Sequence, residues 1–236
     1  MKNIFSIKIA VLPVFALIVL LPSCSGRINA QLVQNGSGSV QISAGLEPNM
    51  TILIKSFLSL GGGSGSLLNA AELNRSLEAA PGISSSALRN SGQEKVEGTI
   101  GISRIGDLLS TGANRFVQYE TSGSSGKLSA TINRTIAPQI IKQIYPEALD
   151  YLSALMAPVA TGETLGKAEY LMLVESVYGK PLASEIGTSR ITAAITVPGT
   201  VKSVKGGTFT GREARFDIAL VDLLVLEQPL SYEITW

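Results

Sequence analysis

The chain has 236 residues, of which 45% are apolar, 19 are basic and 18 are acidic, and it contains one cysteine and no histidine. This length suits one medium domain or two small ones, at ~100–200 residues per domain. The lack of histidine and of a second cysteine excludes a Ser-His-Asp triad, a Cys-His pair, a zinc site built from these residues and an internal disulfide, so we expect no metal site and no cofactor.

The first 23 residues have the pattern of an export signal. Lys2 and Lys8 make the start positive, and residues 9–21 are apolar throughout. This run is too short to cross a membrane, because a spanning helix needs ~20 apolar residues, and Pro13 interrupts it. We predict that residues 1–23 are a signal peptide.

The sequence Leu21-Pro22-Ser23-Cys24 follows and resembles the lipobox of bacterial lipoproteins. A leucine lies three positions before the cysteine and a small residue directly before it, although Pro22 departs from the small residue typical of its position. The resemblance implies that Cys24 becomes the first mature residue and carries acyl chains such as palmitate, which hold the protein on a membrane outside the cytoplasm. Residues 24–26 would form a lipidated tether. The alternative is an ordinary signal peptide in which Cys24 is incidental.

The charge of the mature chain limits its partners. Lys2 and Lys8 are two of the 19 basic residues, so removal of residues 1–23 leaves 17 basic residues against 18 acidic ones. A nearly neutral chain without a basic run is not expected to bind nucleic acid or to form a polybasic patch that binds lipid headgroups. We expect membrane contact through the anchor, no nucleic acid, and a lipid or envelope protein as a further partner.

Alternating apolar residues after the tether predict a β-hairpin. Residues 27–33 and 40–46 alternate, and Asn35-Gly36 between them supplies the positive φ of a tight turn. A short buried helix or a strand is expected next, over 50–60, followed by a flexible joint over 61–66 and a helix over 67–80. An edge hairpin or a single strand follows over 86–101, and then one or two helical turns over 102–109. A second hairpin is expected from strands 115–121 and 127–133.

Residues 134–187 are predicted to be mainly helical. Apolar residues recur with a period of ~3.6 across residues 135–156, where Pro146 should cause a kink or a restart. Residues 165–178 are apolar on most sides and predict a buried helix that ends at Gly179.

Four side chains of these helices are candidates for binding an apolar ligand: Ile140, Ile144, Leu171 and Val174. If the helices close over the sheet and leave a cavity, these residues would line it. The alternative is that they interlock in a filled core.

The end of the chain returns to strands over 190–197, 201–204, 214–220 and 230–236, with turns at Pro198-Gly199 and Gly206-Gly207. The order of elements predicts a single α+β domain over residues 27–236, in which an antiparallel sheet contains the N-terminal hairpin and the C-terminal strands and the helices pack on one face. Trp236, the last residue, is expected to plug one end of the core.

Motifs that point to catalysis are incomplete. Residues 123–127 (GSSGK) resemble a phosphate loop, but Thr121 and Leu128 occupy the positions of its first glycine and its metal-binding hydroxyl. Ser124 and Lys127 have the Ser-x-x-Lys spacing, which needs a helical turn that a Gly-rich loop does not provide.

Carboxylates at helical spacing, Glu147 with Asp150 and Glu169 with Glu175, suit a solvated face as well as an acid–base pair. Because histidine, the usual acid–base residue, is absent, an enzyme has the least support and we expect no catalytic residues.

Residues 195–216 (ITVPGTVKSVKGGTFTGREARF) resemble the strand, Pro-Gly, strand, Gly, strand pattern of LppM-like bacterial lipoproteins, and the hairpin after Cys24 is similar too. The resemblance implies an α+β domain outside the membrane, contact with lipids and no catalytic residues; residues 135–178 have no counterpart in it. We predict a membrane-anchored, non-catalytic lipoprotein that binds an apolar or lipid ligand. The alternative is a structural or protein-interaction lipoprotein of the cell envelope without a small-molecule ligand.

Overall fold

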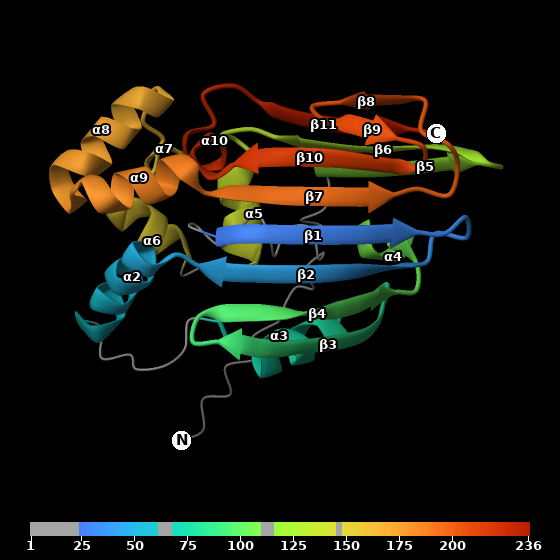
Figure 1. The fold of residues 1–236 in the computed structure, drawn as a ribbon, viewed down its shortest axis with the longest axis horizontal. Helices are drawn as coiled ribbons and strands as arrows, with labels where there is room; N and C mark the ends of the chain where they lie inside the picture. The colour runs from blue at the N-terminus through green and yellow to red at the C-terminus, as the bar shows by residue number, and fades with distance from the viewer. Residues whose placement is uncertain (1–23, 61–67, 110–115, 145–147) are drawn as a thin grey trace, which may run out of the picture.

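Two β-sheets form the body of the protein, one of seven strands and one of four (Figure 1). The structure, a computed structural model, describes residues 24–60, 68–109, 116–144 and 148–236. Helices accompany both sheets, so the fold is α+β, as predicted. The signal peptide, the joint at 61–66 and Pro146 lie outside the described residues.

The larger sheet has the strand order β3-β4-β2-β1-β7-β10-β9. Its strands are β1 (Cys24–Leu32), β2 (Gly38–Leu46), β3 (Ile83–Gly92), β4 (Lys95–Ile102), β7 (Arg190–Thr196), β9 (Thr208–Thr210) and β10 (Glu213–Ala219). Every pair of neighbours is antiparallel except β1 and β7, which run parallel. The expectation of an antiparallel sheet is therefore wrong at this pair, because a long crossover separates β1 from β7 and brings β7 in alongside it.

The N-terminal hairpin is confirmed, with Ile28 of β1 opposite Ile42 of β2. At its turn, the backbone N–H and the hydroxyl of Ser37 both donate to the Asn35 side-chain oxygen, at 2.9 and 2.7 Å. Gly36 has a φ of +79°, as the turn requires.

Strand β1 begins earlier than the sequence indicates. Cys24, Ser25 and Gly26 already pair with residues of β2, so the strand includes the residues expected to form the tether, whose lipidation stays a prediction. The reason is that the backbone groups of these residues find hydrogen-bonding partners on β2.

The smaller sheet is antiparallel throughout, in the order β5-β6-β11-β8. Its strands are β5 (Val117–Ser122), β6 (Ser125–Ile132), β8 (Ser203–Lys205) and β11 (Leu230–Thr235). Strands β5 and β6 form the second predicted hairpin. Strands β8 and β9 are consecutive in the chain but belong to different sheets, so the chain crosses from one sheet to the other at Gly206-Gly207.

The helices lie behind the larger sheet or beyond one of its ends (Figure 1). They are α2 (Pro48–Leu60), α3 (Ala70–Glu78), α4 (Ile105–Leu109), α5 (Ala137–Ile144), α6 (Ala148–Ala154), α7 (Pro158–Thr161), α8 (Lys167–Tyr178), α9 (Lys180–Thr188) and α10 (Leu220–Val225). In the figure α3, α4 and α5 lie behind the sheet, whereas α2, α6, α8 and α9 gather beyond the end where β1 begins. No helix in the described part of the chain is both long enough and apolar enough to span a membrane.

The structure settles two alternatives that the sequence left open. Residues 50–60 belong to helix α2, and residues 86–101 lie in the hairpin of β3 and β4. The sequence patterns did not predict β9 and α10. Helix α9 lies in the region predicted to be mainly helical and starts directly after Gly179, because the following Pro181 is tolerated in a first helical turn.

Helix α8 corrects the expectation of a buried helix over 165–178. Tyr170 and Val174 are fully buried, but Met172 is 62% exposed and Val177 55% exposed, so only one side of α8 packs on the protein. An apolar sequence on most sides of a helix does not by itself show which side has a neighbour.

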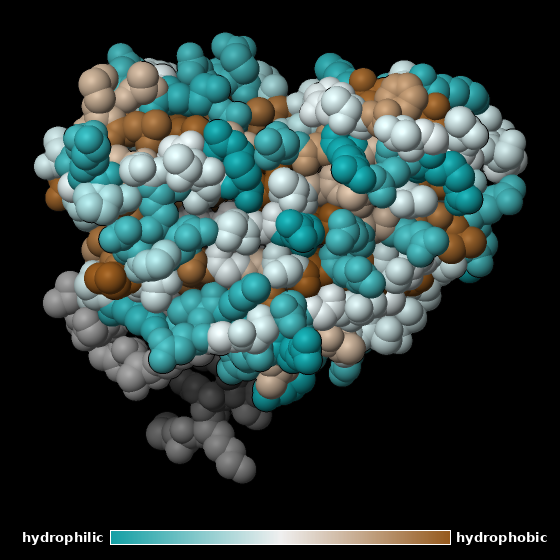
Figure 2. Space-filling view, in the orientation of Figure 1, coloured by the Kyte–Doolittle hydropathy of each residue, from teal (hydrophilic) through white to brown (hydrophobic). Residues whose placement is uncertain are grey.

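The two faces of the larger sheet differ in polarity. Ile28, Ile42 and Ile100 are buried on the side of the second sheet and the helices. The opposite face, seen in Figure 2, is largely hydrophilic, and side chains such as Arg27, Asn29 and Gln41 border a shallow groove on it. The core therefore lies between the two sheets and under the helices.

Candidate ligand cavity

A cavity of about 80 Å³ lies between the two sheets. Ala193 and Phe216 line it from the larger sheet, Leu128 and Ile234 from the smaller one, and Leu108 from α4. Nearly all of the groups that face the cavity are apolar. Water gains few hydrogen bonds in such a space, and an apolar guest suits it better.

Strand alternation and small side chains explain the cavity. Ala193 pairs with Phe216 of β10 and with Ile28 of β1, so an alanine separates two large side chains on the inner face of the sheet. Ala30 lies one pleat further along β1 and also lines the cavity. Because neither methyl group reaches the facing sheet, space is left between the layers.

Two aromatic rings border the cavity. The rings of Phe216 and Tyr232 meet edge to face, with centroids 5.5 Å apart and an interplanar angle of 81°. Burial raises the pKa of Tyr232 to about 12, and the nearby carboxylates Asp222 and Asp217 contribute to the rise. The phenol is therefore neutral at physiological pH and adds no charge to the cavity.

The crossover at Gly206-Gly207 packs against these two rings. A Cβ atom on Gly206 would lie 2.8 Å from Cδ1 of Tyr232, and one on Gly207 would lie 2.7 Å from Cδ1 of Phe216 and would overlap the Arg215 carbonyl oxygen. Only glycine lets the backbone approach both rings so closely. The turn predicted at these glycines is confirmed, and it lies against two rings that line the cavity.

Trp236 is buried between other residues, in agreement with the expected plug. Its side chain is 3% exposed, and its backbone exchanges two hydrogen bonds with Gly126, at 3.0 and 2.9 Å. Its ring lies 6.1 Å from that of Tyr119, measured between centroids. The Tyr119 hydroxyl is buried and has no hydrogen-bond partner among the described residues, and burial raises its pKa. A buried unpaired hydroxyl costs ~1–3 kcal/mol, which a polar ligand atom or a water molecule would offset.

Three of the four residues predicted to bind a ligand do not line this cavity. Ile140 and Val174 are buried in the core, and Leu171 is half-buried beside Gly187 of α9. The side chain of Ile144 lies outside the described residues. Ile140, Leu171 and Val174 are not among the residues that line the cavity between the sheets, so a ligand role for these four stays a prediction.

The Ser-x-x-Lys spacing does not form a catalytic pair. Ser124 lies in the tight turn between β5 and β6, where Ser122 pairs with Ser125. The ammonium of Lys127 lies 2.8 Å from a carboxylate oxygen of Glu233. This hydrogen bond and the negative charge of Glu233 raise the pKa of Lys127, whereas a lysine base at neutral pH needs a lowered pKa.

The described carboxylates at helical spacing either cap a helix or are exposed to solvent. A side-chain oxygen of Glu169 accepts a hydrogen bond from the Gly166 backbone at 2.8 Å, which caps α8, and Glu175 and Asp150 are exposed. Glu147 lies outside the described residues. Within the described part of the chain, no three His, Cys, Asp or Glu residues are grouped closely enough to hold a metal ion.

We therefore expect a chelator or a reductant to leave the melting temperature of the domain unchanged, since neither a metal nor a disulfide stabilises it. Thermal unfolding with and without EDTA, and with and without dithiothreitol, measures this. A shift of several degrees with EDTA would instead reveal a cation site made of carboxylate and carbonyl oxygens.

No protein-family model matches this sequence, and no curated protein matches it. Among solved structures, the folded domain of LppM from Mycobacterium tuberculosis, determined by NMR, is similar to this chain. The superposition covers 90% of this chain and 88% of the LppM chain, with a TM-score of 0.38 and 8% sequence identity. The likeness is distant and concerns the course of the chain alone.

Proposed function

We propose that the protein is an extracytoplasmic, membrane-anchored lipoprotein without catalytic activity, and that it binds an apolar or lipid ligand between its two sheets. The cavity carries the ligand proposal because its lining comes from both sheets and from α4 and is nearly all apolar. The anchor proposal rests on the apolar run that precedes Cys24 and on its lipobox.

An apolar group bound in the cavity would stabilise the fold. At ~24 cal/mol per Å³, a void of about 80 Å³ costs on the order of 2 kcal/mol of folding free energy. A bound apolar group would recover that energy through contacts with the lining. In another protein, an apolar cavity of ~150 Å³ binds benzene, so voids of this order accept small apolar guests.

The size of the cavity limits what it holds without movement. Ligand pockets usually measure ~300–1,000 Å³, so an acyl chain would fill this cavity and press the sheets apart. The Gly206-Gly207 crossover, where the sheets are joined by two short strands, is the natural place for such a movement.

An interaction lipoprotein is the second candidate, and the helices beyond the end of the larger sheet favour it. Ile52 on α2 is 68% exposed, and Met172 and Val177 on α8 are 62% and 55% exposed. Exposed apolar side chains that share one end of a molecule can contact a partner protein. In this case the cavity would be a packing defect without a ligand.

A cavity-filling variant separates these functions. We expect Ala193→Leu to abolish retention of an apolar ligand, because the larger side chain occupies the space between the sheets. Ala194→Leu is the matched control, since Ala194 is the next residue of β7 and faces the opposite side of the sheet. The measurement is native mass spectrometry of residues 24–236 carrying Cys24→Ser, which removes the protein's own lipid.

The unmodified cavity should retain a ligand through purification or take up added fatty acid or phospholipid, and Ala194→Leu should behave in the same way. If the protein with Ala193 intact remains free of ligand under all these conditions, the ligand proposal is wrong and the interaction lipoprotein remains.

A further inference from the structure

Two cations lie together at the crossover between the sheets. The backbone N–H of Val201 donates to the carbonyl of Gly211 at 2.9 Å, and this bond brings the backbone at Lys202 beside that at Arg212. Both side chains are exposed, and neither belongs to an ion pair among the described residues.

Hydrogen bonds position these cations without neutralising them. The Lys202 ammonium donates to the Ser125 hydroxyl at 3.3 Å, and Nε of Arg212 donates to the carbonyl of Val197 at 3.0 Å. The terminal guanidinium nitrogens of Arg212 are left to bind an anion. A guanidinium suits carboxylate and phosphate oxygens because its N–H groups form a planar fork.

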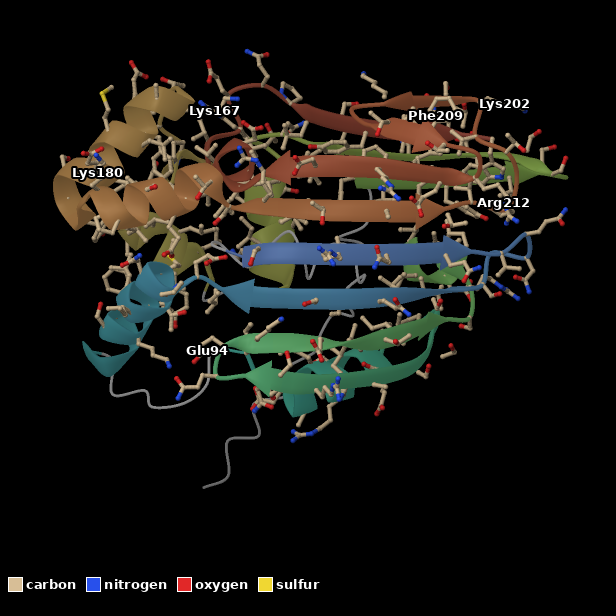
Figure 3. All side chains as sticks on the ribbon, in the orientation of Figure 1. Glu94, Lys167, Lys180, Lys202, Phe209 and Arg212 are labelled. Carbon is tan, nitrogen blue, oxygen red and sulfur yellow. The ribbon has the colours of Figure 1, made fainter. Side chains whose placement is uncertain are left out.

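An exposed aromatic ring lies at the same end of the molecule. Phe209 is 45% exposed, and Figure 3 places it near Lys202 and Arg212, far from Lys167 and Lys180 on the helices. In the register of the larger sheet Phe209 pairs with Ala214, so it lies on the face that also carries Phe216. Phe209 is therefore on the inner side of the edge strand, at the rim of the space between the sheets.

The strand pairs next to the crossover are short. Strand β8 pairs with β11 through three residues, and β9 pairs with β10 through three, whereas β1 and β2 pair through nine. The two glycines between β8 and β9 rest directly on the cavity rings of Tyr232 and Phe216. Parting these short ladders would expose the cavity and break few hydrogen bonds.

We propose that the ligand is an anionic amphiphile, with its carboxylate or phosphate bound by Lys202 and Arg212 and its acyl chain passing Phe209 into the cavity. This inference rests on the proposed ligand-binding function and adds the class of ligand and the position of its headgroup. Strand β1 runs from Cys24 toward this end of the sheet, parallel to β7, and spans about 30 Å at ~3.3 Å per residue. The headgroup site thus lies a full strand away from the anchor.

The test compares amphiphiles that share one acyl chain and differ in charge. Residues 24–236 with Cys24→Ser are titrated at pH 8 with oleate, with oleoyl lysophosphatidic acid and with neutral monoolein, and binding is followed by calorimetry. We expect both anionic ligands to bind at least about tenfold more tightly than monoolein, a difference worth ~1.4 kcal/mol. Comparison of oleate with the phosphate ligand shows which headgroup is preferred.

Charge-neutral variants locate the headgroup. Lys202→Gln with Arg212→Gln should reduce the affinity for both anions to that of monoolein and leave monoolein binding unchanged. The matched control is Lys180→Gln with Arg75→Gln, which removes one lysine and one arginine that are also exposed and outside the ion pairs of the described residues. The control should bind all three amphiphiles as the parent does.

The ring at the rim has its own control. Phe209→Ala should lower the affinity for all three amphiphiles by a similar factor. Val33→Ala, which shortens another half-exposed apolar side chain, should leave the three affinities unchanged.

The possible outcomes separate the two proposals. Equal binding of the neutral and anionic amphiphiles, or no effect of the Lys202 and Arg212 variant, would overturn the headgroup site and leave the cavity proposal standing. Failure of all three amphiphiles to bind the parent protein would overturn the proposed ligand-binding function itself.

Discussion

Replacement of Cys24 by serine is expected to abolish membrane partitioning in the native host. The thiol is the acyl acceptor in a lipobox, and each buried CH₂ of an acyl chain contributes ~0.8 kcal/mol to membrane binding. Serine removes the sulfur but keeps the backbone that pairs with Leu46, so the fold should be unchanged. Detergent-phase fractionation of cells that express the variant measures the loss, and circular dichroism checks the fold.

The neighbouring Ser25→Ala is the control for this experiment, because Ser25 is exposed and is not the acceptor. This variant should remain in the detergent phase together with the parent protein. If the Cys24→Ser protein is also found there, the lipoprotein proposal is wrong and Cys24 is incidental.

Truncation of Trp236 to alanine is expected to cost ~3–5 kcal/mol of the free energy of unfolding, the range for removal of a buried aromatic side chain. The indole is 3% exposed and packs near Tyr119, Gly126 and Gly199 at one end of the smaller sheet. Its loss would leave a large void there. Urea unfolding followed by far-ultraviolet circular dichroism measures the change, because the variant has no tryptophan fluorescence.

Two further aromatic variants test the explanation. Trp236→Phe keeps a ring in place and should cost clearly less than Trp236→Ala. Phe209→Ala removes a half-exposed ring and should change stability by ~0.5 kcal/mol or less. A cost below about 1 kcal/mol for Trp236→Ala would contradict the conclusion that this residue closes the core.

Local patterns predicted the hairpins well. The alternation around Asn35-Gly36 and around residues 122–126 gave both hairpins with nearly correct bounds, because side-chain period and turn chemistry act over a few residues. The same patterns could not show that β8 and β9 belong to different sheets. The predicted turn at Gly206-Gly207 joins the two sheets and lies against the rings of Tyr232 and Phe216.

The cavity lies at other residues than those that the sequence favoured for a ligand. Apolar helical faces at Ile140 and Val174 suggested a cavity between helices and sheet, whereas these side chains are in the core and the cavity lies between the two sheets. Ala30 and Ala193 carry a signal in the sequence, as small residues at inward positions of alternating strands. That signal has meaning only once the facing sheet is known.

The sequence by itself predicted an export signal and a lipobox at Cys24, which stay predictions, and it predicted the α+β class, since each depends on composition or on contiguous residues. Tertiary structure alone decided the parallel pairing of β1 with β7 and the cavity between the sheets. The physical reason is that these features arise from contacts between residues far apart in the chain, and local periodicity carries no information about which distant strands become neighbours.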